Sequence, residues 1–319
     1  MNRFESSPVP FRLQRSELAV PGSNPGMIEK AAGSEADCVL LDCEDSVAPD
    51  QKSQARCNII SALNEIDWKE TGKTVSVRIN GTESPQIERD VGEIIEKAGY
   101  HIDTILIPKV NTPEDVHAVE RLLSLALLTS GITIRIGLEC LIETALGLVN
   151  VEAIARLSCA TESRLEALHF GMADFSASCQ SRSLTIGEMD SGQTNHIWHP
   201  SRQRILVACR AYGLRAVDGP YGDFRNPQGF IDAATGAAAM GYDGKWAIHP
   251  DQVMLANQVM SPTDAEVEQA RKILDALDQA RSLGQGVVSL DEKMVDAASG
   301  KMAENIISKS LAIAEKPSA

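Results

Sequence analysis

The sequence predicts one (β/α)8 barrel, the TIM-barrel fold, followed by a C-terminal helical appendage. Three observations support this prediction. The chain has 319 residues, of which 43% are hydrophobic and 23% charged, so it can bury the core of a large globular domain. Short apolar, β-branched runs alternate with helical patterns along most of the chain, which is typical of parallel β-α units. Eight such strands, each followed by a helix, precede residue 260, the number that a (β/α)8 barrel requires.

The expected strands are short apolar runs that lead into polar or glycine-containing loops. They cover residues 17–20, 38–43, 74–79, 104–110, 132–139, 165–171, 214–219 and 243–250. The expected helices cover residues 25–33, 52–66, 87–99, 113–128, 150–157, 200–213, 229–241 and 251–260. A doubly wound open sheet is the alternative fold. Its first turn, PGSNPG at residues 21–26, lacks the G-x-G-x-x-G spacing of a dinucleotide site, so we favour the barrel.

The chain after residue 260 is too long to be a simple cap on the barrel. Residues 261–284 form an expected helix, opened by Ser-Pro and closed by Gly, and an extended stretch and a last helix to about residue 313 follow. We therefore expect two domains. Residues 1–260 form the catalytic barrel, and residues 261–319 form a helical extension.

Charge and composition exclude several classes of partner. A net charge of −14 opposes binding to nucleic acid or to an anionic membrane. The first 15 residues lack an apolar signal-peptide core, and no run approaches the roughly 20 apolar residues of a membrane span. Seven cysteines occur without C-x-x-C spacing, which indicates reduced thiols. We expect a cytoplasmic protein.

Polar side chains cluster at the expected carboxyl ends of the strands, where barrel enzymes place their chemistry. The candidates are Asp42, Glu44, Asp45, Arg78, Asn80, Lys109, Glu139, Glu143, Asp174, Asp218 and His249. Several carboxylates at one barrel mouth, without a Cys/His cluster of zinc spacing, predict a hard cation with oxygen ligands. Magnesium is the expected ion, and Mn²⁺ is the alternative.

Glu143 and Asp174 are the expected metal ligands, because each follows a strand through a loop of small residues. Glu44 and Asp45 would hold the waters of the metal. An alternative for this second pair is structural: the two carboxylates would cap the helix that begins near residue 50, or pair with Lys52 and Arg56.

Two cations are expected near these carboxylates. Arg78 on an apolar strand requires an anion, so we expect a structural pair with one of the carboxylates, a role in binding an enolate, or both. Lys109 is either a cation that extends to the barrel rim or a ligand-binding residue.

These segments together resemble the citrate lyase β-subunit-like CoA-ester lyases of the HpcH/HpaI aldolase superfamily, and most closely their malyl-CoA lyase branch. The matching segments are RSELAVPGSNPGMIEKA, LLDCEDSVAPDQKSQAR, VSVRING, ILIPKV, GLECLIETALG, LHFGMADFSAS, AVDGPYGDF and GKWAIHPDQV. They extend from residue 15 to about residue 260, and their order makes the combination specific.

The resemblance implies a role for each matching residue. Glu143 and Asp174 would be the Mg²⁺ ligands, Arg78 the enolate stabiliser, and Glu44 and Asp45 the pair beside the metal waters. Asp296, in DEKMVD, would transfer the proton from the tail of a neighbouring subunit. The CoA thioester would bind at the first barrel loop, through Arg15, Pro21, Gly22, Ser23 and Lys30.

The implied activity is reversible, Mg-dependent, aldol-type cleavage of L-malyl-CoA or β-methylmalyl-CoA. The products would be acetyl-CoA or propionyl-CoA and glyoxylate. Alternatives within the family are a citramalyl-CoA lyase, which releases pyruvate, and a malyl-CoA thioesterase. A tail that completes a neighbour's site requires a homo-oligomer, and the resemblance implies a trimer or hexamer.

Overall fold

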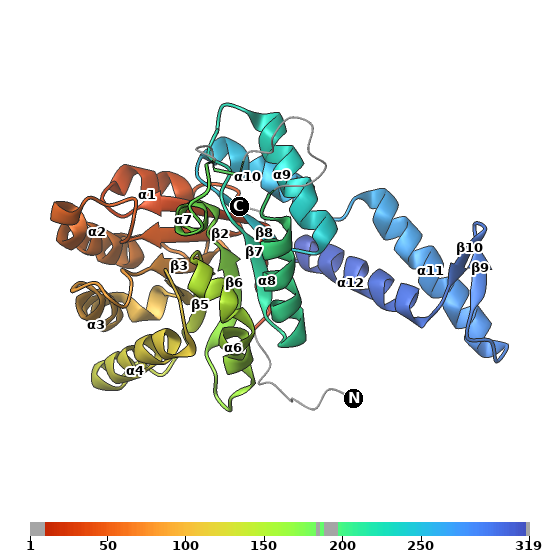
Figure 1. Cartoon of the computed structure of the whole chain (residues 1–319), viewed down its shortest axis with the longest axis horizontal. Coiled ribbons are helices and arrows are strands. Elements are labelled where there is room, and N and C mark those ends of the chain that lie inside the picture. The colour runs from red at the N-terminus through yellow and green to blue at the C-terminus, as the bar shows by residue number, and fades with distance from the viewer. Residues whose placement is uncertain (1–9, 183–185, 188–196, 317–319) are drawn as a thin grey trace. The chain divides into compact units, whose positions relative to one another are not determined.

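A computed structural model of the chain describes residues 10–182, 186–187 and 197–316. The chain divides into two compact units between Met260 and Ser261. The first unit contains a barrel with its surrounding helices, and the second contains two long helices and a small hairpin (Figure 1).

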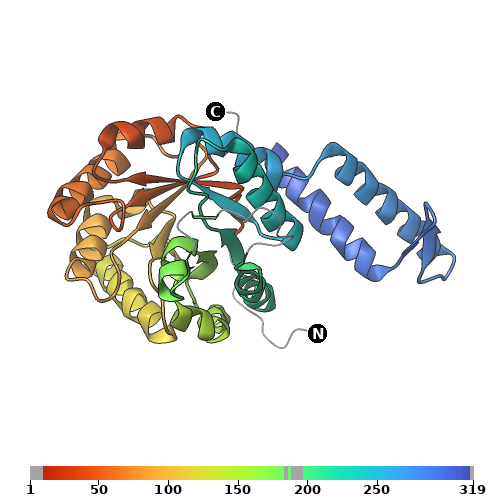
Figure 2. The ribbon, with the colours of Figure 1, turned by 45° about the horizontal axis from the view of Figure 1, so that its top comes forward.

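Eight parallel strands form the barrel in chain order, and the eighth pairs with the first. They are β1 (Ser16–Pro21), β2 (Cys38–Asp42), β3 (Thr74–Arg78), β4 (Thr104–Ile107), β5 (Gly137–Ile142), β6 (Leu165–Phe170), β7 (Arg215–Asp218) and β8 (Gly244–Ala247). Helices surround this ring of strands (Figure 2). The predicted fold class is confirmed.

The surrounding helices bury apolar stripes against the strands, as α3 does with Ile87, Val91 and Ile94. These helices are α1 (Pro25–Ala32), α2 (Lys52–Glu65), α3 (Ile87–Ala98), α4 (Pro113–Ser130), α5 (Ala145–Val149), α6 (Val151–Ala155), α7 (Met172–Ser178), α8 (His199–Ala211), α9 (Pro227–Met240) and α10 (Pro250–Met260). Short 3-10 turns occur at η1 (Pro49–Gln51), η2 (Gly99–His101) and η3 (Arg156–Cys159). In the described ranges, no helix has both the length and the apolar character needed to cross a membrane.

The fifth strand differs from its prediction. It was expected over residues 132–139, but β5 covers Gly137–Ile142. The alternating sequence ITIRI at 132–136 has the pattern of a strand, yet pairing with β4 begins only where Gly137 meets Thr104. A backbone that has not reached its neighbour cannot form a ladder, whatever its side-chain pattern. The shift places Glu139 inside the strand rather than at its end.

Side chains within the barrel form layers, because alternate residues of each strand point inward. A middle layer is apolar and consists of Leu40, Leu106, Leu141, Val217 and Trp246. Residues two positions away on the same strands lie in the layers on either side: β5, for example, carries Glu139, Leu141 and then Glu143. We call Asp42, Arg78 and Glu143 the upper layer, at the carboxyl ends of the strands. We call Glu17, Glu139, His169 and Arg215 the lower layer.

The second unit pairs α11 (Asp264–Ser282) with α12 (Ala297–Ala314), joined through β9 (Val288–Leu290) and β10 (Lys293–Val295). Thr263 and Glu266 form a capping box at the start of α11, which satisfies free backbone N–H groups of its first turn. A Cβ atom at Gly300 would lie 2.8 Å from Leu277 Cδ1, so glycine permits the close packing of the two helices. The extended stretch expected between the helices is an antiparallel hairpin.

Candidate active site at the barrel mouth

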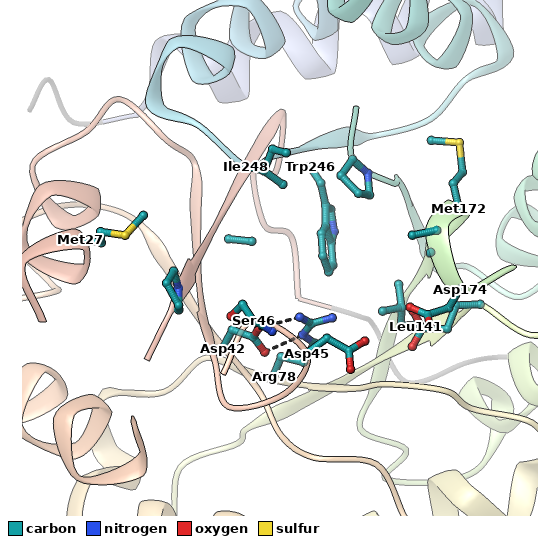
Figure 3. Close-up of a pocket in the computed structure, with 16 residues that line it drawn as sticks. Met27, Asp42, Asp45, Ser46, Arg78, Leu141, Met172, Asp174, Trp246 and Ile248 are labelled. Carbon is teal, nitrogen blue, oxygen red and sulfur yellow. Dashed lines mark hydrogen bonds and ion pairs between the residues drawn. The ribbon is translucent and has the colours of Figure 1, made fainter. Parts of the chain in front are cut away.

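The carboxyl ends of the strands surround a cavity of about 300 Å³. Its polar lining consists of Asp42, Asp45, Ser46, Arg78, Glu143 and Asp174, and its apolar lining includes Pro21, Met27, Leu141, Met172, Trp246 and Ile248. Figure 3 shows Trp246 above the guanidinium of Arg78, with Asp42 and Asp174 on opposite sides. Carboxylates, a guanidinium and apolar side chains therefore share one small cavity.

Arg78 is held by a bidentate ion pair with Asp42. The register of β2 and β3 places the two residues side by side, with distances of 2.6 Å from Nε to Oδ1 and 2.6 Å from Nη2 to Oδ2. Burial raises the pKa of Asp42, but the Arg78 charge and its hydrogen bonds hold that pKa below its usual value. The structural pair predicted for Arg78 is confirmed, and its main partner is Asp42.

Glu44 and Asp45 share a cation, Lys109. The Lys109 Nζ atom contacts Glu44 Oε1 and lies 2.8 Å from Asp45 Oδ2, and Arg78 Nη1 lies 3.2 Å from Glu44 Oε2. Burial lowers the pKa of Lys109, but hydrogen bonds to Asp45 and Glu44 raise it above its usual value overall. Lys109 therefore stays protonated and balances part of the negative charge at the mouth.

The cap and the two partners expected in the structural alternative for Glu44 and Asp45 are wrong, because both carboxylates pair with Lys109 instead. Helix α2 begins at Lys52 after Gln51, which makes no side-chain cap, and η1 before it has none either. Lys52 Nζ donates to the carbonyl oxygens of Cys43 and Glu44. Arg56 pairs instead with Asp90 and Glu93. The mistake arose because the partner, Lys109, is remote in sequence.

Glu143 is buried at the mouth and carries a strongly shifted pKa. Its side chain accepts a hydrogen bond from the Lys109 backbone N–H at 2.8 Å, and the Lys109 backbone has a φ of 52°, which orients this N–H at some conformational cost. Burial, and then the negative charge of Asp174, raise the pKa of Glu143 to about 8. Nearby Gly171 is required, because a Cβ atom there would lie 2.5 Å from Glu143 Cβ.

Asp174 enters the same cavity from the first turn of α7. Four carboxylates and one cation line the cavity: Asp42, Asp45, Glu143 and Asp174 against Arg78. Burial is the first cause of the raised pKa of Glu143 and the charge of Asp174 is the second, ahead of the opposing effect of Arg78, so the negative charge of Asp174 is not fully offset at Glu143. An oxygen donor set with unbalanced charge fits a hard divalent cation, so the residues present fit the predicted metal. The structure brings Glu143, Asp174, Arg78 and Asp45 together as expected.

The expected position of Glu139 at the mouth is wrong, because the shift of β5 places it in the lower layer. There Glu139 is fully buried and contacts His169 Nε2 at 2.9 Å and Arg215 Nη2 at 2.8 Å. Ligand atoms of Glu17, Glu139 and His169 all lie within 4.8 Å of one another, a spacing that a metal could bridge. Protein donors already engage this group, with Gln14 Nε2 donating to Glu17, so we assign it as an internal ion cluster.

Asp218 was also expected at the mouth, but it points away from the barrel interior. Its neighbour Val217 faces inward, so Asp218 lies on the opposite face, 2.8 Å from Lys245 Nζ and 2.9 Å from Arg202 Nη2. The end of a strand alone does not determine which face a side chain takes. Asn80 likewise donates to Asp90, and His249 stacks on Phe224.

The residues expected to bind CoA fall into two groups. Pro21 ends β1 at the mouth, and Gly22 and Ser23 follow it, where a Cβ atom on Gly22 would lie 2.8 Å from the Asp42 carbonyl oxygen. Lys30 is exposed in the last turn of α1. Arg15 precedes β1, at the opposite end of that strand, and its Nε is 2.8 Å from Asp37. The structure does not bring Arg15 to the mouth.

Asp296 lies in the second unit, as the N-cap of α12. Its carboxylate accepts hydrogen bonds from the backbone N–H groups of Ala298 and Ser299. The bond from Ser299 is the main cause of a pKa below the usual value. Its carboxylate is therefore ionised at neutral pH.

Trp246 is a cavity residue that our sequence interpretation overlooked. The Arg78 Cζ atom lies 5.7 Å from the centre of its ring. Alternation along β8 could have identified it, because Lys245 and Trp246 must take opposite faces.

Fold and site together describe a (β/α)8 barrel with an acidic mouth suited to a divalent cation. The profile of the HpcH/HpaI aldolase/citrate lyase family matches residues 15–250, and the chain belongs to this family.

Individual relatives agree with this assignment. The chain is 44% identical to the L-malyl-CoA/beta-methylmalyl-CoA lyase of Cereibacter sphaeroides over 309 residues, 94% of this chain and 95% of the relative. It is 33% identical over 307 residues to the mitochondrial citramalyl-CoA lyase of Mus musculus, covering 95% and 88%. Among solved structures, CitE of Mycobacterium tuberculosis in complex with magnesium, acetoacetate and coenzyme A superposes with a TM-score of 0.74. That match has 26% identity and covers 96% of this chain and 98% of the other.

Proposed function

We propose that the protein is a Mg-dependent CoA-ester lyase that reversibly cleaves L-malyl-CoA or β-methylmalyl-CoA. The products are acetyl-CoA or propionyl-CoA and glyoxylate. The observation that carries the proposal is the arrangement of Glu143 and Asp174 opposite Arg78 in one cavity. The identity with the Cereibacter sphaeroides lyase, greater than with the Mus musculus enzyme, supports glyoxylate over pyruvate as the oxo acid.

Glu143 and Asp174 would hold the metal, with Glu44 and Asp45 orienting its waters. When bound, Mg²⁺ supplies a Lewis acid for the hydroxyl and carboxylate of the substrate. Lys109 holds Glu44 and Asp45 through its ammonium group and Glu143 through its backbone N–H. One residue thus positions three of these carboxylates.

Arg78 stabilises the charge that develops on the thioester. As the carbon-carbon bond breaks, the hydroxyl proton passes to water, the oxo acid forms, and the electron pair of the bond passes into the thioester as an enolate. Two N–H groups of Arg78 donate to Asp42, and Nη1 forms an ion pair with Glu44. A guanidinium has five N–H groups, so those not held by Asp42 can donate to the enolate oxygen.

The ionised carboxylate of Asp296 from a second copy of the chain would remove a proton from the thioester in the condensation direction. In cleavage, the same carboxyl, after taking up a proton from water, would deliver it to the enolate carbon. This role requires a homo-oligomer, which we propose to be a trimer or hexamer. Exposed apolar residues such as Leu128 on α4 and Leu283 after α11 support contacts between copies.

CoA would bind beside the first loop, along Pro21, Gly22 and Ser23, with Lys30 near its phosphates. Arg15 is omitted from this proposal because of its position. All seven cysteines are free thiols, which supports a reducing, cytoplasmic location.

The test is turnover of L-malyl-CoA and citramalyl-CoA by purified protein with Mg²⁺ and with EDTA, assaying glyoxylate and pyruvate separately. We expect Mg-dependent glyoxylate with release of acetyl-CoA. Hydrolysis to free malate and CoA would identify a thioesterase instead, and pyruvate from citramalyl-CoA a different lyase. Light scattering gives the oligomer number.

A second arm isolates Asp296. Asp296→Asn retains an N-cap side chain, so α12 should form. We expect the variant to lose exchange of the acetyl-CoA methyl protons with solvent. Unchanged exchange would assign the proton transfer to another group.

A further inference from the structure

Trp246 connects the cavity to the lower layer of the barrel. Its ring lines the cavity and lies over the Arg78 guanidinium, at 5.7 Å from Cζ to the ring centre. Its Nε1 donates to His169 Nδ1 at 2.9 Å, on the side away from the cavity. The indole therefore contacts Arg78 of the upper layer through its ring face and His169 of the lower layer through its N–H group.

The hydrogen bond to Trp246 determines the state of His169. An indole N–H is only a donor, so His169 Nδ1 accepts and the ring proton is on Nε2. That atom donates to Glu139 at 2.9 Å, and the other oxygen of Glu139 accepts from Arg215. His169 and Glu139 are fully buried, so the imidazole has no solvent alternative to these partners.

Arg78 is restrained in two directions as a result. Asp42 and Glu44 contact its edge and fix it in the guanidinium plane. The indole covers one face and restricts rotation out of that plane. If the indole were free to change rotamer, the second restraint would be lost while the ion pair remained.

We propose that Trp246 is a positioning residue for Arg78, and that the buried His169–Glu139 pair positions Trp246. The lower layer, which does not line the cavity, would then determine the orientation of the Arg78 N–H groups that donate to the enolate oxygen. The kinetic consequence rests on the proposed function, since it assumes that Arg78 binds the enolate.

The first test compares the kinetics of two variants and their combination. Trp246→Phe keeps an aromatic face but removes the N–H donor, and His169→Leu removes the acceptor without touching the cavity. We expect each to lower kcat on the order of 10-fold, with KM nearly unchanged, because misorientation affects the transition state. The double variant should lose no more than either single variant, since both break the same link.

Three controls sharpen the kinetic result. His169→Asn keeps a side-chain acceptor and should restore part of kcat. Trp68→Phe removes an indole N–H that donates to the Ala62 carbonyl in α2, and it should leave kcat unchanged. Circular dichroism establishes whether each variant is folded. If His169→Leu does not fold, the kcat of Trp246→Phe alone tests the proposal.

A second test does not depend on turnover. In protein labelled with 5-fluorotryptophan, the ¹⁹F resonance that disappears in Trp246→Phe belongs to Trp246. We expect His169→Leu to shift or broaden that resonance and to leave the Trp68 resonance in place. If the wild type lacked lyase activity, the proposed function would fail, and this measurement would still test the link between His169 and Trp246.

Additive losses of kcat, an unchanged kcat in Trp246→Phe, or an unchanged Trp246 resonance in His169→Leu would each overturn the proposal. A loss of kcat shared by both variants, with partial recovery in His169→Asn, would support it.

Discussion

The upper and lower layers of the barrel contain the same residue types, carboxylates and cations, in different surroundings. In the lower layer, Glu17 and Glu139 are sealed from solvent and meet His169, Arg215 and the Gln14 amide. In the upper layer, carboxylates outnumber the cations and border an open cavity. The comparison teaches that clustered carboxylates do not themselves define a metal site. What defines it is negative charge that the chain leaves unbalanced beside an open space.

The largest expected effect is a loss of activity and of Mg²⁺ binding from a change in the upper layer that the matched change in the lower layer does not cause. Glu143→Ala should lower kcat/KM by about 10³-fold, near 4 kcal/mol, and abolish Mg²⁺ binding, because it removes a proposed metal ligand. Glu17→Gln, the matched change in the lower layer, should leave both within about 2-fold, since Glu17 neither lines the cavity nor forms one of the hydrogen bonds that join Trp246, His169 and Glu139. Calorimetric titration with Mg²⁺ and steady-state kinetics measure the two quantities. Lost Mg²⁺ binding in Glu17→Gln would show that the lower layer holds the ion.

Arg78→Lys tests the cation of the upper layer. Lysine keeps the positive charge beside Asp42 but loses the planar fork, so the fold should persist. We expect kcat to fall on the order of 10²- to 10³-fold while Mg²⁺ affinity changes little. A variant with full turnover would remove Arg78 from the mechanism.

Gly171→Ala tests the close packing behind Glu143. The new Cβ atom would lie 2.5 Å from Glu143 Cβ, so the carboxylate must move, and we expect about 10²-fold lower kcat/KM. The control is Gly92→Ala in α3, where no heavy atom outside the local helix lies within 4 Å of the added carbon. That change should stabilise the protein by about 0.5–1 kcal/mol and leave activity intact. Equal activities of the two variants would contradict the packing argument.

The smallest expected effect concerns stability in the lower layer. Burial is the main cause that raises the pKa of Glu17 from 4.5 to about 7. The folded state therefore binds more protons than the unfolded state between these values, and the free energy of unfolding falls as pH rises through this window. Glu17→Gln removes the titrating carboxyl and with it that loss. The free energy of unfolding of the variant, relative to that of the wild type, should therefore increase on the order of 2 kcal/mol between pH 4.5 and pH 8. Urea unfolding at the two pH values measures the difference, and a gain toward low pH would contradict the assignment.

Much of the site was predictable because it follows local patterns. Eight apolar runs identified eight strands, and residues just beyond them identified Glu143, Asp174 and Arg78. The failures were of another kind. Glu139 was expected at the mouth because β5 was predicted to end there. Asp218 was expected at the mouth although it lies on the outer face of β7. The cation that pairs with Glu44 and Asp45 is Lys109, not Lys52 or Arg56. The errors over Glu139 and Lys109 concern relations between segments, whereas the error over Asp218 concerns the face that it takes on its own strand.

The sequence by itself therefore determined the strand order, the barrel class and the residues at the strand ends. Hydrophobic periodicity and strand-end loops depend on residues that are close together in the sequence. Only the tertiary structure decided how deep in the barrel each charged side chain lies and which side chain it pairs with. Barrel closure placed Arg78 beside Asp42 and brought Lys109 to Glu44. It also separated Glu143 from Glu139 by one apolar layer, although the two lie four residues apart on the same stretch of chain. Register and closure join segments remote in sequence, and the charge balance that distinguishes an open acidic site from a sealed ion cluster arises only there.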